Sequence, residues 1–181
     1  IISNSGRVMY SATKESDLGA NLRRGSLQDS GLARAYKQAL NQNKPVFTDM
    51  APYAPSNGKP AMFLAKSFSV EDQTFVLAFQ LSDKKISSIM NFRHGYGESQ
   101  EDYLVGTDHL MRSDSYLSPD THSIKASFAN PDTGSVNTEA VQNALRGEID
   151  VEVITDYNGN KVLSAYEPID INGDFQWAII S

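Results

Sequence analysis

The sequence contains no cysteine and only one tryptophan among its 181 residues. Without cysteine there is no disulfide and no thiolate ligand. The three histidines stand at positions 94, 109 and 122, a spacing that fits no structural zinc site. We therefore expect neither a metal nor a cofactor. The absence of cysteine is common in the periplasm and cell exterior, and it favours such a location slightly.

Long apolar runs and clusters of positive charge are also missing. The longest apolar run, Phe75 to Phe79, is much shorter than the roughly 18 to 20 residues that a membrane-spanning helix needs. There are 16 lysines and arginines against 22 acidic residues, which gives a net charge of −6. Nucleic-acid binding draws most of its affinity from clustered cations on phosphates, so we expect no nucleic-acid partner.

What is present is typical of a globular protein, with 40% hydrophobic and 21% charged residues. The length fits one large domain or two small ones. The chain begins with Ile1-Ile2 and stops inside the apolar segment that starts at Trp177. We therefore expect an excised fragment whose signal peptide or membrane helices lie outside it.

The two halves of the chain repeat each other at an offset of about a hundred residues. Residues 2–11 align with residues 104–113, and both segments predict a strand, a turn and a second strand. In each half an amphipathic helix and three strands follow, and the first of these strands carries Val-x-Thr-Asp, ending at Asp49 and at Asp156. Each copy predicts an antiparallel sheet with helices on one face, an α+β fold.

Several motifs carry a resemblance to a known family. In the second half these are Gly-Glu-Ser-Gln-Glu-Asp-Tyr-Leu-Val-Gly at 97–106 and Leu-Met-Arg-Ser-Asp-Ser at 110–115. In the first half they occupy segments 8–11, 14–22 and 49–56. This pattern resembles the double Cache domain, a pair of PAS-like modules that forms the extracytoplasmic sensor of bacterial chemoreceptors and sensor histidine kinases. Two features depart from the family: Ser99-Gln100 replaces Thr-Gly in a turn, and the usual long first helix is missing.

The resemblance implies a membrane-distal module at 1–92, including a linker helix at about 82–92, and a membrane-proximal module at 93–181. It implies a ligand-sensing domain of a methyl-accepting chemotaxis protein or a sensor histidine kinase. Such a domain is the periplasmic or extracellular portion of an inner-membrane protein, dimeric in the full-length receptor and joined to the membrane through flanking helices. A freestanding secreted or periplasmic binding protein is the alternative.

The resemblance leaves the ligand open. Members that bind amino acids carry an Arg-x-Trp-Tyr element in the distal module, and here the sole tryptophan is Trp177. Recognition of amino acids is therefore not implied, and neither is the type of output domain.

Catalytic motifs are absent: there is no Gly-x-Ser-x-Gly, no phosphate-binding glycine loop and no His-Glu-x-x-His. Ser113-Asp114-Ser115 has the residue types of a hydrolase, but neighbours on a strand point to opposite faces. A calcium loop starting at Asp156 would need glycine at its sixth position, where Lys161 stands, so we predict a hairpin turn there. We expect no enzymatic activity; a hydrolase using Ser113 or Ser115 is the rival hypothesis.

We predict a small-molecule pocket in the first module, between its sheet and the loops around 17–29 and 50–58. Asp49 would accept from an ammonium or hydroxyl group, Arg23 or Arg24 would anchor a carboxylate, and the walls would be Tyr10, Tyr53, Phe63 and Phe79. The alternatives are that Asp49 bonds a turn, that the aromatic residues are ordinary core and that the arginines lie on the surface. A second possible pocket involves Tyr103, Arg112, Asp156 and Tyr166, with Arg112 expected to pair with Asp156.

Overall fold

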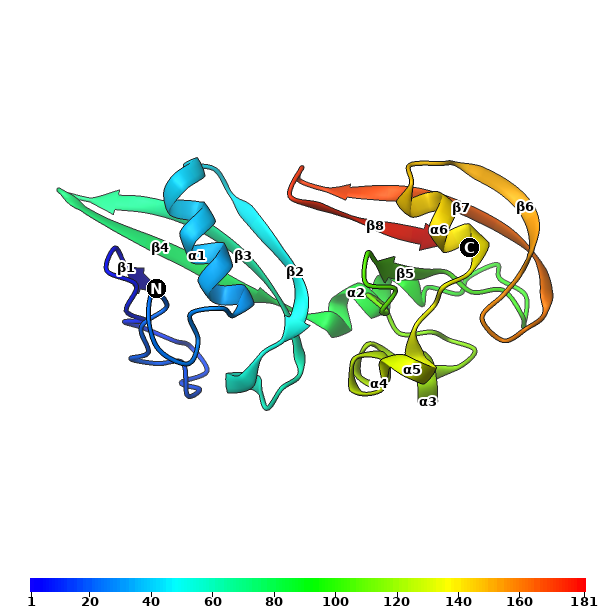
Figure 1. The fold of residues 1–181 in the computed structure, drawn as a ribbon, viewed down its shortest axis with the longest axis horizontal. Helices are drawn as coiled ribbons and strands as arrows, with labels where there is room; N and C mark the ends of the chain where they lie inside the picture. The colour runs from blue at the N-terminus through cyan, green and yellow to red at the C-terminus, as the bar shows by residue number, and fades with distance from the viewer. The chain divides into compact units, whose positions relative to one another are not determined.

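The computed structural model describes residues 1–181 and divides into two compact units, Ile1–Ser82 and Asp83–Ser181 (Figure 1). Each unit has one four-stranded antiparallel sheet with helices packed on it. The predicted α+β class is therefore confirmed. None of the helices combines the length and the apolar character that crossing a bilayer requires.

The first unit contains one long helix on one face of its sheet (Figure 1). The strand order is β1-β4-β3-β2. In chain order the elements are β1 (Ile2–Ser3), α1 (Gly31–Gln42), β2 (Val46–Pro52), the short 3-10 helix η1 (Ala54–Ser56), β3 (Pro60–Val70) and β4 (Gln73–Leu81).

Helix α1 forms where the apolar periodicity predicts it. The Ser30 side chain caps it by accepting a hydrogen bond of 3.2 Å from the Ala33 amide. The helix ends at Asn43, whose φ of 49° is the left-handed conformation common at helix ends. The side chains that it buries against the sheet are Leu32, Ala33, Ala35, Tyr36 and Ala39.

A long loop connects β1 to α1 and closes the unit on the side of the sheet that carries α1. The loop folds back on itself through hydrogen bonds from the Val8 amide to the Ala20 carbonyl and from the Gly19 amide to the Val8 carbonyl, both 2.9 Å. Its Val8, Leu22 and Leu27 side chains belong to the buried core. The second strand predicted at Val8–Ser11 is wrong, because this segment forms only a single bridge, between Ile2 and Val8.

The second unit repeats this topology with the strand order β5-β8-β7-β6. The second strand predicted at Leu110–Ser113 is again only a bridge, between Val105 and Met111. The elements are α2 (Asp83–Met90), β5 (Tyr103–Gly106), α3 (Pro119–His122), α4 (Ile124–Ala129), α5 (Pro131–Gly134), α6 (Glu139–Leu145), β6 (Asp150–Thr155), β7 (Lys161–Ile171) and β8 (Phe175–Ile180).

The repeat is one of topology and not of residue-for-residue pairing. The last hairpin turns through Glu71-Asp72 in the first unit and through the longer segment 172–174 in the second. As a result Phe75 pairs with Phe68, whereas Phe175 pairs with Ile171.

Helix α2 packs with the second unit. The buried Ser87 hydroxyl accepts a hydrogen bond of 3.0 Å from the Asp114 amide, and the Asn91 side-chain amide donates to the Asp114 carbonyl at 3.2 Å. The structure therefore divides the chain between Ser82 and Asp83, ten residues before the boundary that the sequence suggested. The apolar residues at 86–90 predict one buried face on this helix, but they do not indicate which half of the chain packs against that face.

Candidate functional site

A pocket of about 380 Å³ lies in the first unit, between the loop after β1 and the face of the sheet that carries α1. Val8 and Leu32 contribute apolar walls, and Asp17 and Gln80 contribute polar groups. This volume is within the range of small-molecule sites, which combine apolar walls with a few fixed polar groups.

Asp17 is the polar group with the most unusual surroundings. Its side chain is only 9% exposed, and its Oδ2 atom accepts a hydrogen bond of 3.0 Å from the Tyr53 hydroxyl. Its Oδ1 atom is buried and has no hydrogen-bond partner. A buried carboxylate oxygen without a donor is costly, so a ligand that donates a hydrogen bond here would recover that free energy.

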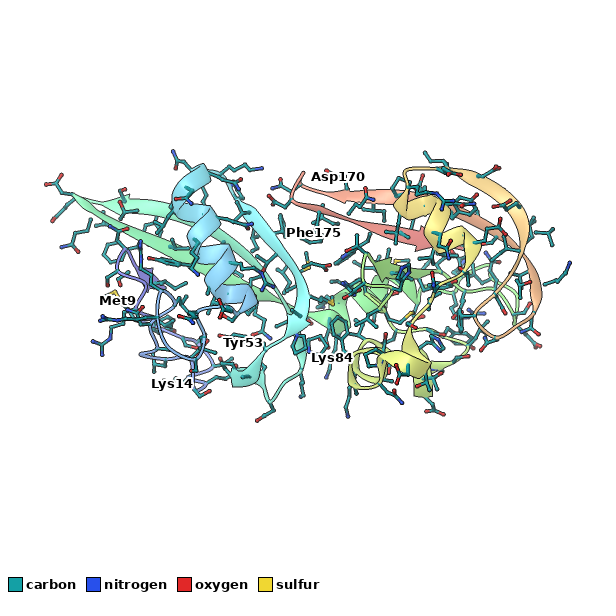
Figure 2. The ribbon with its side chains drawn as sticks, in the orientation of Figure 1. Met9, Lys14, Tyr53, Lys84, Asp170 and Phe175 are labelled. Carbon is teal, nitrogen blue, oxygen red and sulfur yellow. The ribbon has the colours of Figure 1, made fainter.

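Tyr53 lies directly after the end of β2 (Figure 2), and its hydroxyl holds Asp17 through the hydrogen bond of 3.0 Å. It is 1% exposed, and its ring contacts the Phe63 ring edge-on with centroids 5.0 Å apart. Burial raises the pKa of the Tyr53 hydroxyl, and the charge and hydrogen bond of Asp17 and the charge of Glu15 raise it further. The Tyr53 hydroxyl therefore keeps its proton at physiological pH and donates it in the hydrogen bond to Asp17.

A second set of hydrogen-bonded polar side chains lies beside the pocket wall. The Ser56 hydroxyl donates to Glu15 Oε2 at 3.0 Å and lies 3.4 Å from the amide nitrogen of Gln80. Glu15 and Asp17 place two carboxylates on this side of the loop, and no cationic side chain lines the pocket. This electrostatic environment favours a positively charged ligand group.

Three of the six predicted site residues line this pocket, and a fourth, Tyr53, contacts the lining residue Asp17. Phe63 forms a deep wall and is 3% exposed. Tyr10 and Phe79 also line the pocket, but alternation along β4 places the Phe79 side chain on the opposite face of the sheet from Gln80. Tyr53 acts through Asp17.

Arg23 and Asp49 do not line the pocket. The Arg23 guanidinium donates to the Tyr36 hydroxyl at 2.8 Å and to the Asn4 carbonyl at 3.0 Å, so it ties the loop to α1. Asp49 lies at the bulge in β2, where its Oδ1 atom accepts a hydrogen bond of 2.7 Å from the Met50 amide.

No sequence pattern singles out Asp17, Gln80 or Leu32 as site residues. Asp17 lies in a loop with no hydrophobic periodicity, so no pattern indicates which way its side chain faces. For Gln80, alternation along β4 places it on the same face as Val76 and Ala78, and this signal could have identified it.

The polar residues considered in the second unit have structural roles. Ser113 Oγ accepts from the Leu104 amide at 2.9 Å, and Ser115 Oγ donates to Glu101 at 2.8 Å. Arg112 forms an ion pair of 3.0 Å with Asp108, whereas Asp156 accepts hydrogen bonds from the Asn158 and Asn160 amides of its own turn. The predicted hairpin turn at Asp156 is confirmed.

Three tyrosines, of which Tyr53 and Tyr103 are buried and Tyr157 is partly buried, make the protein sensitive to alkali. Burial is the main cause that raises the pKa values of Tyr53, Tyr103 and Tyr157, with nearby acidic groups adding to it. An unfolded tyrosine ionises at about pH 10, so their contribution to stability is complete below that pH and declines as the pH rises above it. We expect these three of the eight tyrosines to remain neutral until the protein unfolds. The near-ultraviolet absorbance of tyrosinate tests this; ionisation of all eight in one step with unchanged circular dichroism would contradict it.

No model of a known protein family matches the sequence, and no curated protein matches it.

Solved structures do match. The ligand-binding domain of the Pseudomonas fluorescens chemoreceptor CtaA, in complex with L-serine, aligns with a TM-score of 0.55 and 18% identity, over 99% of this chain and 68% of that one. The domain of Campylobacter jejuni chemoreceptor Tlp3, with 4-methylisoleucine, gives a TM-score of 0.62 and 13% identity, over 99% and 62%. The extracellular domain of mmHK1S-Z2, described as a histidine kinase, gives a TM-score of 0.50 and 15% identity, over 81% and 53%.

The present chain thus spans between about half and two thirds of these structures. At such identities the similarity establishes the fold. The predicted fold, two tandem PAS-like modules that each have an antiparallel sheet with flanking helices, is confirmed.

Proposed function

We propose that this chain is the ligand-sensing domain of a bacterial transmembrane receptor, and that its first unit binds a small molecule carrying a protonated amine. The observation that carries this proposal is the buried carboxylate of Asp17, whose Oδ1 atom lacks a donor at the wall of the pocket. An ammonium group would supply both the missing hydrogen bond and the opposite charge.

The comparisons support this choice of ligand class. Two of the structurally similar domains were solved with L-serine and with 4-methylisoleucine, and amino acids carry a protonated amine. In the present chain, no lysine or arginine lines the pocket to hold a carboxylate, and the terminal ammonium of Ile1, which does line it, donates to the Tyr10 carbonyl at 2.8 Å. The ligand class is therefore defined by the amine, and a simple amine fits as well as an amino acid.

The sensing role places the first unit distal to the membrane and the second unit proximal to it, outside the cytoplasm. Flanking helices would connect the domain to the membrane and join two copies in the receptor. The domain itself has no catalytic step: binding shifts an equilibrium between two conformations, by as much as the ligand's affinities for the two differ. Chemotaxis and histidine kinase signalling are the two outputs that such receptors serve.

A binding screen with a matched pair of variants tests the ligand site. The probes are amines such as putrescine and L-serine, each with a counterpart that lacks the amine, and binding is measured by isothermal titration calorimetry. For an amine that binds, Asp17→Asn is expected to weaken affinity about 100-fold, because a charged hydrogen bond is lost. The asparagine retains an oxygen that accepts from Tyr53, so the loop should stay in place.

Asp49→Asn is the matched control, since it removes the same charge from the same unit outside the pocket and should leave affinity unchanged. The proposal fails if Asp17→Asn binds the amine as tightly as the unmodified protein. It also fails if only the counterparts without an amine bind.

A further inference from the structure

A second and larger cavity, of about 590 Å³, lies within the second unit. It opens between the segment that leads into β5 and the strands β6 and β7. Its walls are mostly apolar and include Tyr103, Leu117, Ile154, Val162 and Ile180. Of these, Tyr103, Ile154 and Ile180 belong to the hydrophobic core of the unit, so the cavity reaches inside the fold.

The Ser164 hydroxyl is the distinctive polar group of this cavity. Alternation along β7 places Val162, Ser164 and Tyr166 on the face of the sheet that carries the core. The Ser164 side chain is 2% exposed, lines the cavity, and has no hydrogen-bond partner. A buried hydroxyl without a partner is costly, and an apolar side chain of similar size would fit this strand position without that cost.

The acidic groups at the cavity already have partners inside the protein. Glu101 accepts hydrogen bonds from the Ser115 and Tyr157 hydroxyls and from the Tyr116 and Leu117 amides. Asp156 accepts from the amides of its own turn. Neither carboxylate therefore needs a cationic ligand in the way that Asp17 does.

The charges at the cavity also disfavour an anionic ligand. Lys161 is exposed at the first residue of β7, where water solvates it, and it is outnumbered by Glu101 and Asp156. Burial raises the pKa of the Tyr103 hydroxyl, so that this wall stays uncharged at physiological pH. A ligand buried here would meet apolar walls and one hydroxyl that both donates and accepts.

We propose that the cavity of the second unit is a separate binding site for an uncharged, mostly apolar molecule that carries one hydroxyl or carbonyl oxygen, which the Ser164 hydroxyl binds. The site differs from the pocket at Asp17 in both its position and its chemistry. The protein would accordingly hold an amine in the first unit and a neutral ligand in the second, and neither site depends on the other for its contacts.

The test compares three probes of similar shape: benzyl alcohol, toluene and benzoate. Trp177 is the only tryptophan and lies buried in β8, so its fluorescence during thermal unfolding follows the second unit alone. A ligand that binds only the folded state raises the midpoint of that transition. We expect benzyl alcohol to raise it most, toluene less and benzoate not at all.

Two substitutions locate the effect. Ser164→Ala should weaken benzyl alcohol binding about fivefold to tenfold, to the level of toluene, since one hydrogen bond is lost. Ser164→Thr keeps a hydroxyl on a β-branched side chain that suits a strand, and should keep the preference for the alcohol. Asp17→Asn should change none of these values, which separates this site from the proposed amine site.

Equal midpoint shifts for benzyl alcohol and toluene in the unmodified protein would overturn the proposal. An unchanged preference for benzyl alcohol in Ser164→Ala would also overturn it, because the Ser164 hydroxyl would then not be the group that binds the oxygen of the alcohol. An absence of any shift with all three probes would show that the cavity does not bind this class of molecule.

Discussion

Replacing Glu101 with alanine should lower the free energy of unfolding of the second unit by about 3 to 5 kcal/mol. The Glu101 side chain is 8% exposed and accepts hydrogen bonds from two hydroxyls and two backbone amides. Alanine would leave all four donors without that acceptor in a partly buried place. A buried donor that loses its partner costs more than the hydrogen bond itself contributed.

Urea unfolding followed by Trp177 fluorescence measures this loss in the second unit. Glu98→Ala is the matched control, because it removes the same side chain from an exposed position three residues earlier. We expect the control to unfold at the same urea concentration as the unmodified protein. If the two variants shift the midpoint equally, the hydrogen bonds of Glu101 do not stabilise the unit.

Replacing Gly134 with alanine should also destabilise the second unit strongly, by about 3 kcal/mol, as overpacking of a close contact does. A Cβ atom at Gly134 would stand 2.5 Å from the Ser127 Cα and 2.8 Å from the Thr121 carbonyl oxygen. Both neighbours are backbone atoms, so no side-chain rotation relieves the clash. The Ser127 hydroxyl lies at the same contact. It donates to the Gly134 carbonyl at 2.7 Å and accepts from the Met111 amide at 3.0 Å.

Gly97→Ala provides the control for this substitution. A Cβ atom at Gly97 would meet nothing within 4 Å, and the residue has no positive φ. Its thermal unfolding midpoint should therefore match that of the unmodified protein, while the midpoint of Gly134→Ala falls. An unchanged midpoint for Gly134→Ala would mean that the three short helices α3, α4 and α5 move apart at little cost.

Local patterns in the sequence predicted most of the regular structure. The spacing of Leu32, Tyr36 and Ala39 gives α1 its buried face, and Ser30 caps it. Gly147, with a φ of 94°, ends the second predicted helix, and both halves contain the predicted three-stranded antiparallel meander. These features depend on contacts between residues close in sequence, which periodicity and turn chemistry record.

The candidate site was predicted only in part. Hydrophobicity suggested Phe63, which lines the pocket, and Tyr53, which contacts Asp17, and the site was expected in the first half of the chain, where the proposed amine site also lies. The sequence suggested Asp49 as the acceptor, whereas the acidic residue that lines this pocket is Asp17, and only the fold decides which of the two faces the cavity. The bulge in β2 changes the register beside Asp49, and single sequences carry no clear signal for a bulge.

The sequence by itself determined the α+β class, the duplication, the helices α1, α2 and α6 and the hairpins, because each is encoded by patterns within short segments. Only the tertiary structure decided which polar side chains lack a partner. Asp17 owes its unpaired oxygen to the folding of a loop without periodicity over the sheet, and Ser164 owes its isolation to the apolar neighbours around it. Whether a polar group is satisfied depends on residues far away in the chain, and that information exists only once the chain is folded.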